Sequence, residues 1–138
     1  MLFRSDNFTK LKTTLLPTLD GALAALVLGL EQKGLLASTA VMVTGEFGRT
    51  PKINARAGRD HYVKCWSAAL AGCGIKGGQV YGSSDENGVD VKDNPVSEGD
   101  FFATIYKALG INPKKENYSG VRPIPLAPFG SNVVEKLF

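Results

Sequence analysis

Several features that would assign a protein to a functional class at once are missing from this chain of 138 residues. Only two cysteines occur, Cys65 and Cys73, and they form neither a disulfide framework nor a CxxC pair. We expect both to be buried thiols, with a single disulfide between them as the alternative. The net charge of +3 is too small to indicate nucleic-acid binding, and Lys and Arg do not cluster in one block. We therefore expect no nucleic-acid partner.

Long apolar runs are also missing. No run approaches the roughly 20 residues that a membrane span needs, so no membrane span is predicted. The start of the chain lacks the apolar core of a signal peptide, and the residues alone leave the localisation unknown. The composition, with 43% hydrophobic and 21% charged residues, is that of an ordinary globular protein. The length is sufficient for one domain, residues 1–138, with a core.

Two helices are indicated by the spacing of apolar residues. In the first, leucines recur every three or four positions and Pro17 suits the first helical turn. Gly34 is a good terminator for it. The second helix carries an apolar face between Phe101 and Leu109, has Ser97 or Asp100 as its cap and ends at Gly110. The leucines of the first helix are Leu16, Leu19, Leu23, Leu26 and Leu30.

Two strands are indicated between these helices. The run Ala40–Val43 is typical of a strand buried on both faces of a parallel sheet. The run Trp66–Ala71 predicts a second strand, followed by a glycine-rich turn at 72–78. That turn matches G-x-G-x-x-G but opens no helix, so a dinucleotide site is rejected. Helix, turn and strand in this order are half of a βαβ unit and indicate the α/β class. Residues 1–11, 83–95 and the proline-rich tail from 111 are expected to be irregular.

The segment 45–61, directly after the first strand, collects the polar side chains that could form a site. Ligands of open α/β sheets bind beyond the carboxyl ends of strands, which is where this segment begins. The alternative is a solvated loop in which the arginines brace the backbone and the histidine is structural. The candidate residues are Glu46, Arg49, Arg59, Asp60 and His61.

Several blocks of the chain resemble sulfatases. Residues 17–20 and 34–44 are similar to the helix, turn and strand that precede the sulfatase Asp-His metal motif, and 72–78 and 95–111 are similar to two later sulfatase segments. GEFGRTPKIN at 45–54, followed by GRDH at 58–61, resembles the signature of a bacterial sulfatase-like family, domain of unknown function 1501, of the alkaline phosphatase superfamily. The resemblance runs from about Phe8 to the C-terminus.

This resemblance implies a partial alkaline phosphatase-like α/β/α sandwich, consisting of the C-terminal portion of the sheet and its flanking helices. It implies a metal-dependent hydrolase of sulfate or phosphate esters, with a small-molecule or polymeric substrate. Glu46, Asp60 and His61 would be ligands of zinc, calcium or magnesium, with orientation of His61 as the alternative role of Asp60. Arg49 and Arg59 would be the catalytic donors to the oxyanion. Phe47 stands where relatives place a histidine ligand, and this departs from the sulfatase pattern.

The superfamily places its nucleophile and first metal carboxylates upstream of the region that this chain resembles. We therefore expect a truncated domain, the C-terminal fragment of a hydrolase, which is inactive alone. Its open sheet edge would favour oligomers or edge pairing. The alternative is a non-catalytic binding or surface-assembly protein that retains the fold. Relatives often begin with a twin-arginine signal, which would imply export from the cytoplasm, although no such signal occurs in this chain.

Overall fold

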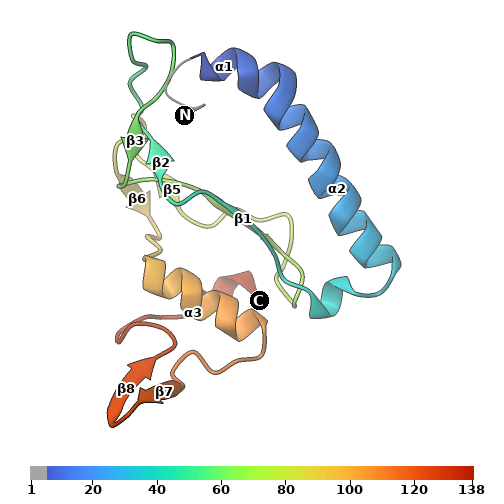
Figure 1. The fold of residues 1–138 in the computed structure, drawn as a ribbon, viewed down its shortest axis with the longest axis vertical. Coiled ribbons are helices and arrows are strands. Elements are labelled where there is room, and N and C mark those ends of the chain that lie inside the picture. Colours follow the sequence, from blue (N-terminus) through green and yellow to red (C-terminus); the bar gives the residue numbers. More distant parts are fainter. Residues whose placement is uncertain (1–5) are drawn as a thin grey trace.

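The computed structural model describes residues 6–138, in which helices and short strands are mixed as the α/β class predicts. The long N-terminal helix runs along one side, with β1 in the middle and α3 beyond it (Figure 1). The helical segments are α1 (Asn7–Lys10), a π-helical segment (Leu11–Leu15), α2 (Leu16–Gln32), a 3-10 turn (Leu36–Ser38), α3 (Glu98–Ala108) and a second 3-10 turn (Glu135–Leu137). The strands are β1 (Val41–Thr44), β2 (Gly48–Arg49), β3 (His61–Tyr62), β4 (Ala68–Ala71), β5 (Ser83–Ser84), β6 (Val91–Asp93), β7 (Glu116–Ser119) and β8 (Arg122–Pro125).

The first predicted helix is confirmed and is longer than expected. It ends as predicted, with Gly34 in the left-handed region at φ +67°. It begins earlier, because α1 and the π-helical segment continue into α2 without a break. The expectation of an irregular start is therefore wrong for residues 7–11, and residues 1–5 lie outside the described part. The hydroxyls of Thr13 and Thr18 donate to the helix carbonyls four residues earlier at 2.9 and 2.8 Å, which satisfies these side chains within the helix on both sides of Pro17.

This continuous helix, Asn7–Gln32, is also more apolar than the sequence prediction allowed for. By length and composition it could cross a membrane, and no part of that apolar stretch is buried inside the chain. Core helices and signal sequences near an N-terminus meet the same criterion. The finding therefore assigns no location, and it identifies a helix whose apolar side chains lack cover from the described residues.

The central strand pair differs from the parallel sheet that was predicted. β1 pairs with β4 in the antiparallel sense, with Val41 opposite Ala71 and Thr44 opposite Ala68. The expected burial on both faces is wrong, because Met42 is 49% exposed and Val41 and Val43 are half-buried. Within residues 6–138 each sheet has two antiparallel strands, so β1 has β4 as its one neighbour there. The α/β/α sandwich stays a prediction.

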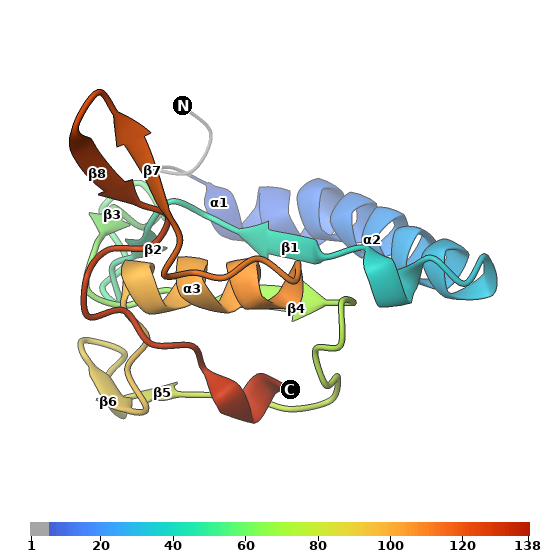
Figure 2. The same ribbon diagram turned by 90° about the horizontal axis from the view of Figure 1, so that it is seen from below.

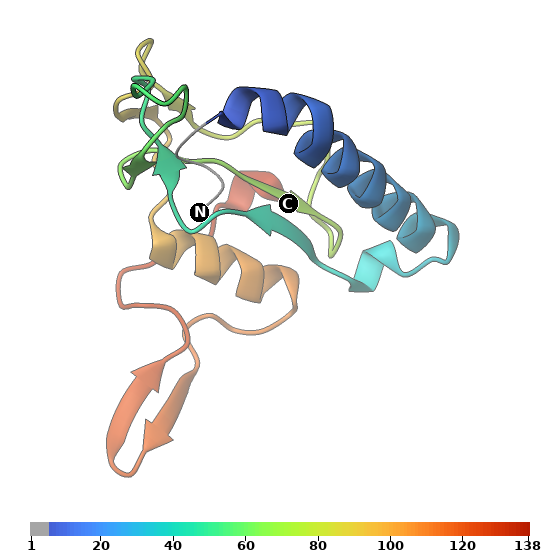
Figure 3. The ribbon, with the colours of Figure 1, turned by 45° about the horizontal axis from the view of Figure 1, so that its top comes forward.

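Two segments expected to be irregular contain strands. β5 pairs with β6, and β7 pairs with β8 across a two-residue connection at Gly120–Val121. The β7–β8 hairpin projects from the rest of the chain (Figures 2 and 3). Prolines in β8 argued against a strand, since proline has no N–H for a ladder. A two-stranded ribbon tolerates them because the outer edge of each strand needs no partner strand.

The second predicted helix is confirmed, together with its cap. The Ser97 hydroxyl accepts from the Asp100 N–H, and the Asp100 carboxylate accepts from the Ser97 N–H, both at 3.1 Å. The same carboxylate accepts from the Asn132 N–H at 2.6 Å. One turn later, the Thr104 hydroxyl accepts from the Val134 N–H at 3.0 Å, and Thr104 is 1% exposed. One acid and one hydroxyl thus attach the C-terminal tail to α3.

The apolar core of the described chain is small. Its buried hydrophobic residues are Ala103, Ala127 and Val134, and many large apolar side chains are exposed. The accessible surface is 9735 Å² for 14.7 kDa. A compact monomer of that mass exposes about 6,900 Å². The excess surface includes the leucines of α2 and the uncovered edge of β1.

We expect the purified 138-residue chain to self-associate or to unfold without a sharp transition, because uncovered apolar side chains and an open strand edge favour association. Light scattering after gel filtration, with thermal unfolding by circular dichroism, measures both properties. Replacing Leu19 and Leu26 by glutamate should reduce the associated fraction. Val121→Glu, at a hairpin tip that is 97% exposed, is the control and should leave association unchanged. A monomer with one sharp transition would contradict this expectation.

We expect Asp100→Asn to destabilise the chain at neutral pH by about 1–2 kcal/mol, since it removes a charged acceptor from two backbone N–H groups. The N–H of Asn132, followed by the hydroxyl and N–H of Ser97, lowers the pKa of Asp100. The carboxylate therefore stabilises the fold fully above its unfolded pKa of about 3.9 and loses this effect as the pH falls through the lower folded pKa. Urea unfolding at pH 7 and pH 2.5 should show a difference between variant and parent that becomes smaller in acid. Asp20→Asn, on exposed α2, should show none at either pH.

Candidate functional site

The hairpin of β2 and β3 brings the two parts of the predicted site together. It pairs Gly48 with Tyr62 and Arg49 with His61 in antiparallel register. Gly48 is needed here, because a Cβ atom at this position would collide with the carbonyl oxygen of Cys65. In Figure 1 the hairpin lies at the end of the extended segment that continues from β1. The blocks GEFGRTP and GRDH are thus neighbours in space, as a shared site requires.

Arg49, Phe47 and His61 form one cluster on this hairpin. Side chains directly opposite each other in an antiparallel pair lie on the same face, which places Arg49 beside His61. The Phe47 and His61 ring centroids are 4.0 Å apart, and the Arg49 guanidinium carbon lies 5.7 Å from the Phe47 ring centroid. His61 is exposed, whereas Arg49 and Phe47 are half-buried. The cluster presents a guanidinium and an imidazole side by side against one aromatic ring.

Arg59 has a different environment from Arg49. Its Nη1 donates to the carbonyl oxygens of Thr50 at 2.7 Å and of Pro51 at 2.6 Å. Its guanidinium also lies 5.6 Å from the ring centroid of Phe8. Arg59 therefore acts as a brace between the loop and the first helical turn, which is the alternative considered for both arginines. The described structure offers no contact that supports its predicted catalytic role, which stays a prediction.

The loop between β2 and β3 is fixed at its neck and at its tip. At the neck, the N–H of Thr50 donates to the carbonyl of Asp60 at 3.0 Å, and the N–H of Asp60 donates to the Thr50 hydroxyl at 3.1 Å. At the tip, the Asn54 side-chain oxygen accepts from the N–H groups of Arg56 and Gly58 at 3.0 and 3.1 Å. The loop conformation is thus set by its own polar groups rather than by a core.

A second loop, residues 85–90, also contacts β3 and the residues that follow it. The Tyr62 hydroxyl donates to the carbonyl of Val89 at 2.7 Å, and Lys64 forms an ion pair with Asp90 at 3.2 Å. This pairing, with a hydrogen bond from the ammonium to Asp90, raises the pKa of Lys64. Within the second loop, the N–H of Val89 lowers the pKa of Asp85, which also accepts from other backbone N–H groups of its turn.

The predicted metal ligands are not brought together as a complete set. The Asp60 carboxylate accepts from the Asn54 amide at 3.3 Å, the His61 ring lies against Phe47, and Glu46 is exposed. Across residues 6–138, no group of three or more His, Cys, Asp or Glu side chains could hold a metal ion. The described residues therefore do not fit a metal centre by themselves. Cys65 and Cys73 are free, half-buried thiols, so the disulfide alternative is not adopted.

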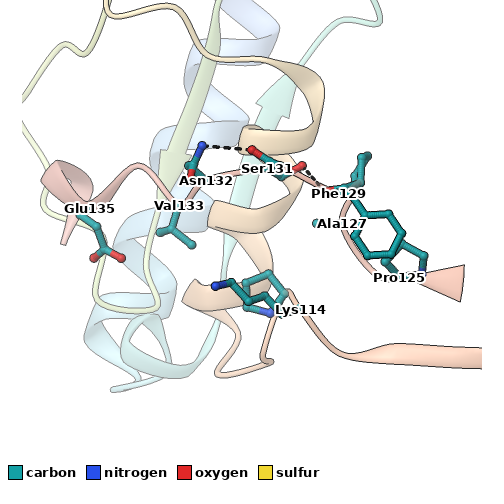
Figure 4. A pocket seen from close by; sticks show the side chains of 11 residues that line it. Lys114, Pro125, Ala127, Phe129, Ser131, Asn132, Val133 and Glu135 are labelled. Carbon is teal, nitrogen blue, oxygen red and sulfur yellow. Dashed lines mark hydrogen bonds between the residues drawn. The ribbon is translucent and has the colours of Figure 1, made fainter. Parts of the chain in front are cut away.

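A cavity that the sequence did not indicate lies in the C-terminal part (Figure 4). Its volume is about 470 Å³, and Lys114 and Glu135 are its charged lining residues. Prolines and backbone line much of it, and none of the five predicted site residues contributes. Its polar lining residues are scattered through the proline-rich tail, so no motif in the sequence could have identified it.

We expect Arg59→Gln to loosen the loop, since the guanidinium connects two carbonyls and the Phe8 ring. Limited proteolysis should cut the variant within residues 50–60 several-fold faster than the parent chain. Lys52→Gln, on the same loop with an exposed side chain, is the matched control and should be cut at the parent rate. Equal rates in all three proteins would show that Arg59 is not a brace.

Comparison with known proteins identifies the family of this chain. No curated protein and no solved structure is similar enough to count as a match. A family model described as "Protein of unknown function (DUF1501)" matches residues 5–138. That match includes both motif blocks of the β2–β3 hairpin and nearly all of the chain. The chain belongs to the DUF1501 family of proteins of unknown function.

Proposed function

We propose that this chain is the C-terminal part of a metal-dependent sulfatase-like or phosphatase-like ester hydrolase, and that Arg49 and His61 face the anionic group of the ester. The register of the β2–β3 hairpin carries this proposal, because it pairs these two residues on a braced, accessible hairpin. The sulfatase resemblance of the surrounding blocks supports the choice of substrate. The chain would be inactive alone.

The chemistry of the two side chains suits a sulfate or phosphate ester. A guanidinium presents planar, paired N–H donors that match two oxygens of such a group. An imidazole N–H beside it can bind a further oxygen or supply a proton to the departing alkoxide. Donors aimed at oxygens whose charge increases in the transition state accelerate the reaction. Phe47 restricts the His61 ring from one side and leaves it exposed elsewhere.

The described residues supply no complete metal site and no assigned nucleophile. We therefore derive no step through a metal and give this chain the task of binding and orienting the anion. Glu46, Asp60 and His61 stay predicted ligands that would need further groups from a partner segment, and a His61 that holds a metal would leave the anion to Arg49. The accessible surface of 9735 Å², well above the value of about 6,900 Å² for a compact monomer of this mass, is in keeping with such a partner.

We expect inorganic sulfate and phosphate to bind at the hairpin, and His61 allows a direct measurement because it is the one histidine of the sequence. Its imidazole C–H signals in proton NMR should shift saturably as either anion is added. Arg49→Gln should weaken the apparent anion affinity by about ten- to a hundredfold, since a charge-assisted hydrogen bond contributes about 1.5–3 kcal/mol. Lys92→Gln, an exposed lysine on β6, is the control and should retain the response.

The outcome against this proposal is an unchanged His61 spectrum at high anion concentration, or an equal response in the Arg49 variant and its parent. A parallel titration with Zn²⁺ tests the metal ligands separately. Since no three-ligand group occurs in residues 6–138, we expect no saturable zinc response. Stoichiometric bound zinc, measured by mass spectrometry of the purified protein and lost in an Asp60/His61 double alanine variant, would show that the ligand set is complete after all.

The second candidate is a binding or surface-assembly protein that retains the fold without turnover. The use of Arg59 as a brace and the aromatic Phe47 against His61 favour it. A panel of chromogenic sulfate and phosphate esters, assayed with divalent metals on a longer polypeptide that contains this sequence, separates the two. Anion binding without any turnover would favour the binding protein, and turnover that needs Arg49 would favour the hydrolase.

A further inference from the structure

Positive charge is concentrated in the loop that carries the candidate site. Although Lys and Arg form no contiguous block, four of the 16 lie within residues 49–59, which contain no Asp or Glu. The 12 others are outnumbered by the 13 Asp and Glu of the chain. The net charge of +3 thus arises entirely from this one stretch. A small net charge for the whole chain conceals a strongly basic segment.

Two of these four cations differ from Arg49 and Arg59, which are half-buried. Lys52 and Arg56 are exposed, and neither forms an ion pair with another of residues 6–138. Their backbone is fixed, since the Lys52 carbonyl accepts from the Thr50 hydroxyl at 2.9 Å and the Arg56 carbonyl accepts from the Asp6 N–H at 2.9 Å. They are therefore cations on a preorganised loop rather than on a free tail.

The start of the long helix extends this basic surface. The contact between Asp6 and Arg56 and the stacking of Arg59 on Phe8 join the loop to the first helical turn. Figures 1 and 3 both show the loop beside the start of α1. Lys12 follows Phe8 by four residues, on the same side of that helix, and is exposed. We call Lys12, Lys52 and Arg56 the basic rim. Asp6 and Asp60 are the acids beside it, and Asp60 accepts from Asn54.

We propose that the basic rim binds flanking sulfate groups of a sulfated polysaccharide while Arg49 and His61 face the ester that reacts. This inference rests on the proposed function and narrows its substrate to a polymer. A small ester at the Arg49–His61 pair would leave the rim cations unused, whereas a polyanion engages both and releases bound counterions. Residues 48–60 contain no aromatic side chain, and the rings beside them, Phe47 and Phe8, already lie against His61 and Arg59, so a nucleic acid is the less favoured polyanion.

We expect the chain to bind heparin, a highly sulfated polysaccharide, and to lose most of this affinity in the double variant K52Q/R56Q. The variant should elute from a heparin column at clearly lower salt. The magnitude of the slope of log affinity against log salt concentration should fall by about two, because the variant loses two cation–sulfate contacts. K92Q/K136Q removes the same charge from two exposed lysines elsewhere and is the matched control, with elution close to the parent. Desulfated heparin should not retain the parent chain.

Each other outcome is decisive. Equal losses in K52Q/R56Q and K92Q/K136Q would overturn the rim, because net charge alone would then govern binding. Tighter binding of single-stranded DNA than of heparin would overturn the choice of polymer. The His61 response to free sulfate separates this inference from the proposed function, and K52Q/R56Q should keep it. If His61 responds normally to sulfate but K52Q/R56Q keeps its heparin binding, the rim alone is refuted. If the chain binds heparin but His61 does not respond to sulfate, the role of the rim in substrate binding is refuted.

Discussion

A shortage of buried apolar surface is the constraint on which the rest of this structure depends. Three hydrophobic residues are buried in the described chain, so hydrophobic burial cannot by itself fix the relative positions of its elements. Polar side chains directed at the backbone do so instead. Asp100 and Thr104 hold the tail against α3, and Asn54 and Arg59 hold the loop between β2 and β3. Each of these groups satisfies N–H or carbonyl groups that would otherwise lack a partner.

The same constraint explains how a loop can serve as a site. A two-residue pair such as β2–β3 is too short to be stable alone. The neck formed by Thr50 and Asp60, the tip closed on Asn54 and the anchor from Tyr62 to Val89 hold it from three directions. The register, which places Arg49 opposite His61, follows from those anchors. The side chains that bind the anion in our proposal thus do not have to stabilise the hairpin themselves.

Local signals in the sequence predicted the elements whose stability is local. Gly34 ended the first helix and Ser97 capped the second as expected, because each feature depends on backbone geometry within one turn. The two motif blocks were expected in one loop, and the structure pairs Arg49 with His61 on one short hairpin, whereas the roles of the site residues stay predictions. The pairing sense of β1 was not predictable, because an apolar run of four residues has the same appearance beside a parallel or an antiparallel neighbour. The contacts of Arg59 depend on the positions of the Thr50 and Pro51 carbonyl oxygens in the folded loop. The spacing of residue types in the sequence does not predict those positions.

Arg49 and Arg59 show that the charge of a side chain and its access to a ligand must be considered separately at this site. Arg59 satisfies two backbone carbonyls and stacks on Phe8, so its donors are directed into the loop while its charge still contributes to the local field. Arg49 also donates to a loop carbonyl, that of Arg59, at the longer distance of 3.4 Å, and it lies across from His61 and beside Phe47 on the hairpin face. Lys52 and Arg56 combine exposed charge with a fixed backbone, and they carry that field beyond the hairpin. Cations farther than a Debye length of about 8 Å from one small bound anion are largely screened and add little to its binding. They contribute most when further anionic groups of the same molecule lie along the surface, and for this reason the charge distribution favours a polymeric ligand.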